Sequence, residues 1–167
     1  MIEKLKRALA ELVGPEEEAP LAIEGEEAAK VEAKRGPGLL VTDYKARGFH
    51  LDLQVDSSQV VAAAEILDSE KFFIEAVTGV DWLAEQELEV VYDFSHFHYP
   101  CRVVVRTRLP RAKPEVATIS GIYPGANWHE RETHDFFGIT FLGHPDLSPL
   151  LLPEDADFHP LLKDFKA

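Results

Sequence analysis

The chain has 167 residues, of which 46% are hydrophobic, and a formal net charge of −13 at pH 7. This length suits one domain with a core of its own and is too short for two domains of ordinary size. The acidic balance argues against a nucleic-acid partner, because phosphate binding needs clustered lysine and arginine.

The single cysteine and the lack of a long apolar run indicate in which cellular compartment the chain is found. Cys101 is expected to be a small buried residue on a strand, and one thiol provides neither an internal disulfide nor an iron–sulfur site. No apolar run approaches the roughly 20 residues needed to cross a bilayer, and no signal-peptide core follows the N-terminus. We expect a cytoplasmic chain that reaches a membrane only through another protein.

The N-terminus is predicted to be an amphipathic helix over residues 2–13. Apolar residues recur at helical spacing, and Gly14 with Pro15 ends the pattern. The glutamate-rich segment that follows, up to residue 35, is too polar to contribute much core and is predicted to be solvated.

The middle of the chain alternates strand and helix patterns. Residues 49–56 alternate apolar and polar side chains, which predicts a strand with one buried and one solvent-facing side. Asp56 and Gln59 are placed to cap a helix over residues 60–68, and a strand is expected through residues 72–76.

Two further strands are predicted at residues 88–94 and 101–107, joined by a short hairpin at 96–100. Glu89 and Asp93 on the first strand face Arg102 and Arg106 on the second, and opposite charges favour antiparallel pairing. The order of elements predicts an α+β fold with a mostly antiparallel sheet and packed helices.

A third helix is predicted from Asn127 to Gly138. Asn127 is expected to cap its first turn together with Glu130, and Gly138 to end it in the left-handed conformation. Arg131 and Asp135 stand four residues apart, as do Glu130 and His134, so both are expected to pair along the helix.

The C-terminal segment after Gly138 is rich in leucine but fits no helical or strand period. Pro145, Pro149, Pro153 and Pro160 exclude a long helix or a central strand. We expect an extended irregular segment, which either folds back over its own sheet or lies in a groove on a partner.

Histidines offer the main candidate for chemistry. His129 and His134 are five residues apart, which is poor geometry for a zincin helix, and His96 with His98 supplies only two ligands. The carboxylates of Glu130 and Asp135 fall on different helix faces. Neither catalytic nor metal-binding residues are therefore expected, and a small metal-dependent hydrolase using His96, His98 and His129 is the remaining alternative.

The stretch from Ala126 to Leu147 resembles the signature of the 30-kilodalton, or C-type, subunit of NADH-quinone oxidoreductase (respiratory complex I), with weaker similarity at 80–82 and 159–164. The resemblance implies that the signature residues bind a partner. These residues are Asn127, Trp128, Glu130, Arg131, Glu132, Asp135, Phe137, Gly138, Phe141, Gly143, His144, Pro145, Leu147, His159, Pro160, Lys163 and Asp164.

The resemblance further implies a cofactor-free subunit of the peripheral arm, at the cytoplasmic face of the membrane. It would dock on the homologue of the D-type subunit, the neighbour that helps form the quinone pocket. It would support electron transfer from NADH to quinone in a proton-translocating complex whose NAD(H), FMN, iron–sulfur clusters and quinone belong to other subunits. The alternative is the equivalent subunit of a ferredoxin- or deazaflavin-dependent complex or of a hydrogenase complex.

Three domains follow from these expectations: residues 1–35 as helix and acidic segment, 36–125 as the α+β core, and 126–167 as signature helix and partner-binding segment. The chain departs from the family pattern at Ser148, Pro149, Phe158 and Leu162. Basic residues are usual near the first two of these positions and at the last, so the facing surface of the partner is expected to be less acidic.

Overall fold

The computed structural model describes residues 2–14, 16–18 and 35–166. Its elements in chain order are α1 Ile2–Val13, β1 Glu16–Glu18, β2 Gly38–Val41, α3 Tyr44–Arg47, β3 Leu51–Val55, α4 Val60–Ser69, β4 Phe72–Trp82, β5 Glu87–His96, β6 Arg102–Pro110, β7 Glu115–Ala117, α5 Ala126–Phe137 and β8 Thr140–Leu142. The acidic residues predicted to be solvated at 24–32 lie outside the described residues.

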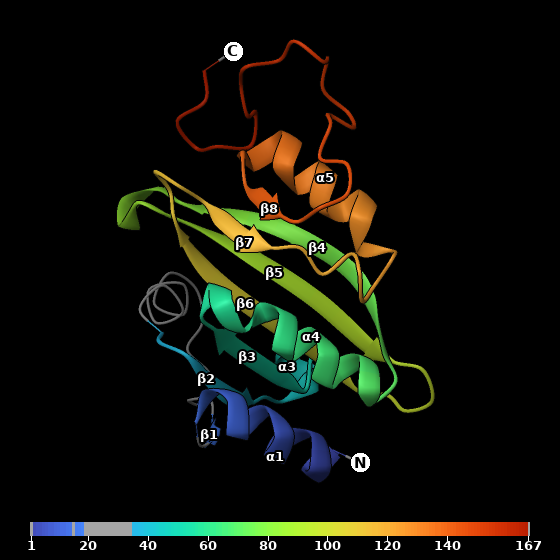
Figure 1. Cartoon of the computed structure of the whole chain (residues 1–167). Helices are drawn as coiled ribbons and strands as arrows, with labels where there is room; N and C mark the ends of the chain where they lie inside the picture. Colours follow the sequence, from blue (N-terminus) through green and yellow to red (C-terminus); the bar gives the residue numbers. More distant parts are fainter. Residues whose placement is uncertain (1, 15, 19–34, 167) are drawn as a thin grey trace.

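The central sheet has six strands in the order β1-β2-β3-β6-β5-β4 (Figure 1). Three neighbouring pairs run antiparallel (β2 with β3, β6 with β5, β5 with β4), whereas β1 with β2 and β3 with β6 run parallel. The predicted α+β class with a mostly antiparallel sheet is confirmed. The parallel β3–β6 pair arises because α4 and the β4–β5 hairpin intervene between these two strands.

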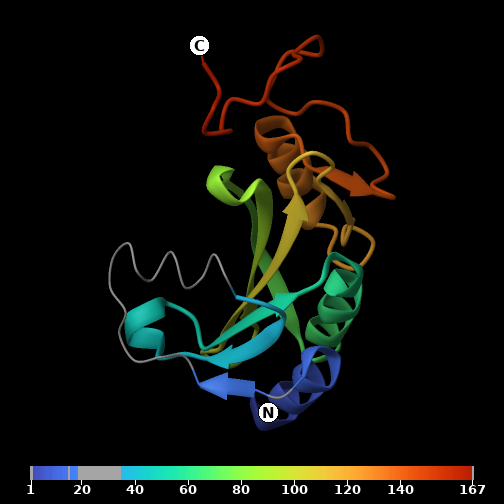
Figure 2. The same cartoon turned by 90° about the vertical axis from the view of Figure 1, so that its left-hand side faces the viewer.

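Helices α1 and α4 cover one face of the sheet, and α5 lies beside β4 at its far edge (Figures 1 and 2). The predicted N-terminal helix is confirmed: Leu5 and Leu9 are fully buried, and Gly14, at φ +102°, donates to the carbonyl of Ala10. The capping box of Asp56 and Gln59 before α4 is also confirmed. Each helix thus turns its apolar stripe to the sheet.

The other face of the sheet is charged, but its β3 part is buried, so the expected solvent-facing side of β3 is wrong. Asp52 is 3% exposed, because its carboxylate is paired with Arg35 at 3.0 Å and with Arg106 at 3.2 Å. Glu89, 2% exposed, pairs with Arg108 at 3.0 Å. The arginines lie across the strands, so their aliphatic stems shield the carboxylates while the guanidinium groups neutralise them.

The predicted hairpin of β5 and β6 is confirmed, and Glu89 stands directly opposite Arg108. Arg102 pairs with Glu75 on β4 at 2.8 Å and lies 3.9 Å from Asp93. Strand β4 extends to Trp82, six residues beyond the predicted strand. This extra length forms the platform on which α5 packs.

Helix α5 approaches β4 closely at Gly79. A Cβ atom at Gly79 would lie 2.4 Å from Cδ2 of Phe137, so only glycine leaves room for this ring. Phe137 was predicted to bind a partner, but the structure places its ring against the sheet, where it packs on the core.

Replacing Gly79 by alanine is expected to lower the free energy of unfolding by about 1–3 kcal/mol, because the added methyl group overpacks the α5–β4 contact. Thermal unfolding of the purified chain measures this loss. In the Phe137→Ala background the same substitution should cost far less, since the clashing ring is gone. Equal costs in both backgrounds would contradict this packing.

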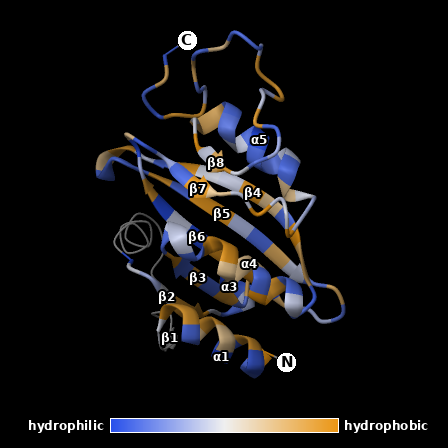
Figure 3. Ribbon diagram, in the orientation of Figure 1, coloured by the Kyte–Doolittle hydropathy of each residue, from blue (hydrophilic) through white to orange (hydrophobic). Residues whose placement is uncertain are grey.

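Beyond β8 the chain continues as residues 143–166, here called the strap, which the structure describes without helix or strand. It loops over α5 (Figure 1) and contains both hydrophilic and hydrophobic stretches along its path (Figure 3). The expected irregular segment is confirmed. In the parts of the chain described here, no helix has the length and apolar character needed to cross a membrane.

Candidate functional site

Helix α5 begins at Ala126, with Gly125 at the N-cap in place of Asn127, two residues earlier than predicted. Asn127 therefore lies inside the first turn, and the predicted capping box with Glu130 is wrong. Glu130 turns instead to the segment after β7, where its carboxylate accepts the N–H of Ile119 at 2.8 Å and the hydroxyl of Thr118. Hydrogen-bond donors from a distant segment have therefore replaced the backbone N–H at the start of the helix that the sequence spacing suggested.

Glu130 is fully buried, and this loss of solvent raises its pKa to about 7, against the lowering effect of its two hydrogen bonds. The imidazole of His144 lies next to it, with Nε2 3.8 Å from the carboxylate. Nδ1 of His144 accepts the N–H of Asp146, so Nε2 carries the proton and donates to the carbonyl of Asn127 at 3.2 Å. His144 thereby fixes the start of the strap to the first turn of α5.

The predicted pair of Glu130 with His134 does not form, since Nδ1 of His134 bonds the carbonyl of Ile139 at 2.8 Å. The predicted ion pair of Arg131 with Asp135 is also wrong. Arg131 donates through Nε to the carbonyl of Ser148 at 3.0 Å and through Nη2 to that of Pro149 at 3.0 Å. Arg131 therefore holds the strap, while His134 holds the turn that follows α5.

Asp135 makes the most concentrated contact with the strap. One oxygen, Oδ2, accepts the consecutive N–H groups of Leu150, Leu151 and Leu152 at 2.9, 2.7 and 3.1 Å. Burial opposes ionisation of Asp135, but the three N–H groups outweigh it and hold its pKa below the usual value. An ionised carboxylate thus fixes the backbone of the leucine run.

The strap returns to the end of α5 at His159. Its Nδ1 bonds the carbonyl of Asp135 at 2.8 Å, and the N–H of Leu161 donates to the carbonyl of Phe136 at 3.1 Å. Gly138 ends α5 at φ +73°, as predicted, and a Cβ atom there would lie 2.7 Å from the His159 ring. Glycine is required at this position both by the turn and by the histidine packed on it.

A second buried carboxylate holds the far part of the strap. Asp81, 2% exposed at the end of β4, accepts two bonds from Arg111 and the N–H of Lys163 at 2.8 Å. Arg111 also pairs with Asp164. The sequence patterns singled out neither Asp81 nor Arg111, although the similarity at residues 80–82 was a signal for the first.

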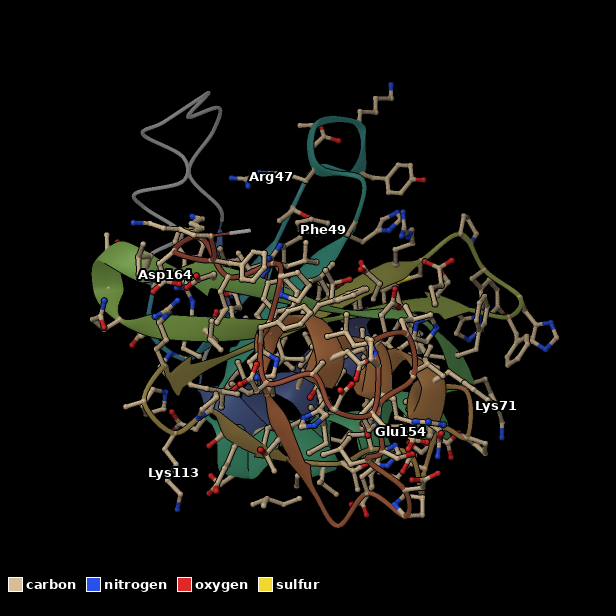
Figure 4. All side chains as sticks on the ribbon, turned by 90° about the horizontal axis from the view of Figure 1, so that it is seen from above. Arg47, Phe49, Lys71, Lys113, Glu154 and Asp164 are labelled. Atoms are coloured by element: carbon tan, nitrogen blue, oxygen red, sulfur yellow. The ribbon has the colours of Figure 1, made fainter. Side chains whose placement is uncertain are left out.

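Apolar side chains of the strap remain on the surface while its backbone is held. In Figure 4, the view from above, Glu154 and Asp164 mark its two sides, with α5 beneath. The rings of Phe158 and Phe165 stack at 5.6 Å, both partly exposed. The large side chains that are strongly exposed on the strap and next to it are Trp128 (60%), Leu142 (50%), Leu151 (59%), Phe158 (40%), Leu161 (52%) and Phe165 (38%).

The first sequence alternative for the C-terminal segment is met in part, because it folds back on α5 and the end of β4. Several of its apolar side chains lie on the surface, and the second alternative, a groove on a partner, stays a prediction. Leu147 and Leu162 pack on the core, and Leu150 and Leu152 are part-buried as well. Leu162 and Phe158 are two of the departures from the family pattern, one facing inward and one outward.

The remaining residues that were predicted to bind a partner lie in different environments. Phe141 is buried, Gly143 turns the chain at φ +82° before the strap, and Glu132 lies part-exposed on α5. Pro145 is exposed and Pro160 part-buried on the strap. The ammonium group of Lys163 lies 6.0 Å from the centre of the Trp82 ring, which leaves it beside the Asp81 contact.

The histidines proposed for the hydrolase alternative lie at two separate places, the β5–β6 hairpin and α5. Nδ1 of His96 accepts the N–H groups of His98 and Tyr99, which shapes the hairpin turn. His129 lies on α5. Among the described residues, no group of three histidine, cysteine or acidic side chains is arranged to hold a metal ion.

The fold and the held strap define a class of protein: an α+β domain with a mixed, mainly antiparallel sheet, whose C-terminal segment is bound through its backbone and shows apolar side chains to solvent. The chain belongs to the family of the respiratory-chain NADH dehydrogenase 30 Kd subunit, whose family model matches residues 53–167.

Relatives carry the same module in different complexes. The chain is 39% identical over 133 residues to the C-type subunit of NADH-quinone oxidoreductase from Roseiflexus sp. (strain RS-1), covering 77% of this chain and 76% of that protein. It is 42% identical over 92 residues to the C-type subunit of F(420)H(2) dehydrogenase from Methanosarcina mazei, covering 54% of this chain and 58% of that protein.

A solved structure has the same fold. It is a chain of the membrane-bound sulfane sulfur reductase, an archaeal respiratory membrane complex, and it is 30% identical to this chain. The match covers 85% of both chains with a TM-score of 0.68.

Proposed function

We propose that this chain is a non-catalytic subunit in the peripheral arm of a proton-translocating NADH-quinone oxidoreductase. It docks on the homologue of the D-type subunit through α5 and the strap, which form the partner-binding unit of residues 126–167. It supports electron transfer from NADH to quinone by holding its neighbour in place, while NAD(H), FMN, iron–sulfur clusters and quinone are bound by other subunits at the cytoplasmic face of the membrane.

One observation carries this proposal: the backbone of the strap is fixed by buried carboxylates, while its apolar side chains point outward. Asp135 and Asp81 hold the strap at two separate points. Large apolar side chains such as Leu151 and Leu161 are more than half exposed. A pre-ordered apolar surface binds a partner at a lower entropic cost than a mobile segment.

The second candidate is the same structural role in a complex with another electron donor. Its support is the 42% identity to the F(420)H(2) dehydrogenase subunit over 92 residues, together with the sulfane sulfur reductase neighbour. The docking role is common to both candidates. The two candidates differ in the subunits of the complex that take electrons from the donor.

Co-purification tests the proposal. The full chain, tagged and expressed in its native host, is expected to be recovered from solubilised membranes with a D-type subunit in a one-to-one ratio. Subunits that bind FMN and NADH in the same complex would support the first candidate, and a deazaflavin- or ferredoxin-oxidising subunit the second. Recovery of the chain without a D-type subunit would contradict both.

A further inference from the structure

Next to the strap, the surface contains a groove of about 750 Å³ between α4 and α5. Val61 and Glu65 of α4 form one wall, and Asn127 and Trp128 of α5 the other, with Pro145 of the strap at the rim. The loop that leads into α5, seen between the two helices in Figure 2, completes the lining. The groove is thus built from both helix layers of the domain and from the first residues of the strap.

Three polar side chains that line the groove are free to form hydrogen bonds or ion pairs with a ligand. Within the described residues, the carboxylate of Glu65, the side-chain amide of Asn127 and the indole N–H of Trp128 make no hydrogen bond or ion pair. Glu65 is exposed and is the only charged residue that lines the groove. A few convergent polar groups among apolar walls are typical of a binding groove.

Trp128 links the groove to the docking surface. Its side chain is 60% exposed, and the guanidinium of Arg131 lies 5.3 Å from the centre of its ring. Arg131 also holds the carbonyl groups of Ser148 and Pro149 on the strap. The groove and the strap surface are therefore continuous, and tryptophan and arginine are among the residues most enriched at the energetic centres of interfaces.

We propose that this groove receives a segment of the same D-type subunit that the strap binds, with a lysine or arginine directed at Glu65 and an apolar side chain on Trp128. The inference rests on the proposed function. The exposed carboxylate of Glu65, in a chain of net charge −13, selects a basic segment over an acidic one. Asn127 provides both a donor and an acceptor for the backbone of that segment.

The test is the affinity of the full chain for its co-expressed D-type subunit. Trp128→Ala is expected to weaken binding by about 10- to 100-fold, the range of an interface centre, and Glu65→Lys to weaken it by at least about tenfold through like-charge contact. Glu65→Gln should lower the salt dependence of binding. Both side chains are exposed, so thermal unfolding of the free chain should not change.

Tyr99→Ala is the matched control, because Tyr99 is 56% exposed at the end of the β5–β6 hairpin and should leave affinity unchanged. A photo-crosslinking residue at position 65 should capture a lysine- or arginine-containing peptide of the D-type subunit. Wild-type affinity of the Trp128 and Glu65 variants, or a crosslink to another protein of the complex, would overturn the groove assignment alone. Lack of binding by the wild-type chain would instead contradict the proposed function.

Discussion

Replacing Asp135 by alanine is expected to release the leucine run of the strap and to weaken association with the D-type subunit by at least about tenfold. The substitution removes the acceptor of three consecutive N–H groups, those of residues 150–152. Bonds to an ionised carboxylate are each worth about 1.5–3 kcal/mol. Without these bonds the strap becomes ordered only when the partner binds, and the entropy lost in this ordering lowers the affinity.

Limited proteolysis of the free chain measures the release directly. Chymotrypsin should cut the Asp135→Ala chain rapidly after Leu150 or Leu151, whereas the wild-type chain should resist at these bonds.

Asp157→Ala is the control for this experiment. Asp157 is an exposed acid of the same strap, and it makes no hydrogen bond within the described residues, so its loss should affect neither cleavage nor affinity. Equal protease resistance of the Asp135→Ala and wild-type chains would show that other contacts, such as those of His159 and Lys163, hold the strap without the carboxylate.

The local elements were predictable because short-range rules determine them. The helix stop at Gly138, the capping box of Asp56 and Gln59 and the β5–β6 hairpin all depend on residues a few positions apart. Burial on the polar side of the sheet was not predictable, since Asp52 pairs with arginines at positions 35 and 106, far away in sequence. The alternation of apolar and polar residues along a strand identifies its two faces, but it does not show which other parts of the chain cover each face.

Predictions at the candidate site failed for the same reason. Spacing of four residues placed Arg131 beside Asp135, and a helical pair of this kind is worth only about 0.3–0.5 kcal/mol. The strap offers Asp135 three N–H groups and offers Arg131 two carbonyl groups. Stronger partners from a distant segment therefore replace the local pair, and only the tertiary structure reveals which segment supplies them.

Glu130 is expected to make the stability of the chain depend on pH between about pH 4.5 and pH 7. Its pKa is raised from 4.5 to about 7 in the folded chain, mainly by burial. A carboxyl group with a raised folded pKa contributes stability that is fully present below its unfolded pKa and is lost as pH rises through its folded pKa. The shift of about 2.5 units corresponds to about 3 kcal/mol lost between pH 4.5 and pH 7.

Glu130→Gln should remove this part of the pH dependence. The amide fits the same space, accepts the N–H of Ile119 and donates to the hydroxyl oxygen of Thr118, so no buried group is left without a partner. At pH 8 the variant is expected to unfold about 6–12 °C above the wild-type chain, since each kcal/mol shifts the midpoint of a domain of this size by about 2–4 °C. Near pH 4.5 the two midpoints should coincide.

Glu132→Gln provides the control, because Glu132 lies on the same helix but is part-exposed, and its pH profile should follow that of the wild-type chain. Subtracting the Glu130→Gln profile from the wild-type profile isolates the contribution of this one carboxyl group from those of all other titrating groups. A variant that is less stable than the wild type at pH 8 would mean that the ionised carboxylate is well solvated by Thr118, Ile119 and His144. The stability of the chain would then depend on a charged Glu130 and not on a neutral one.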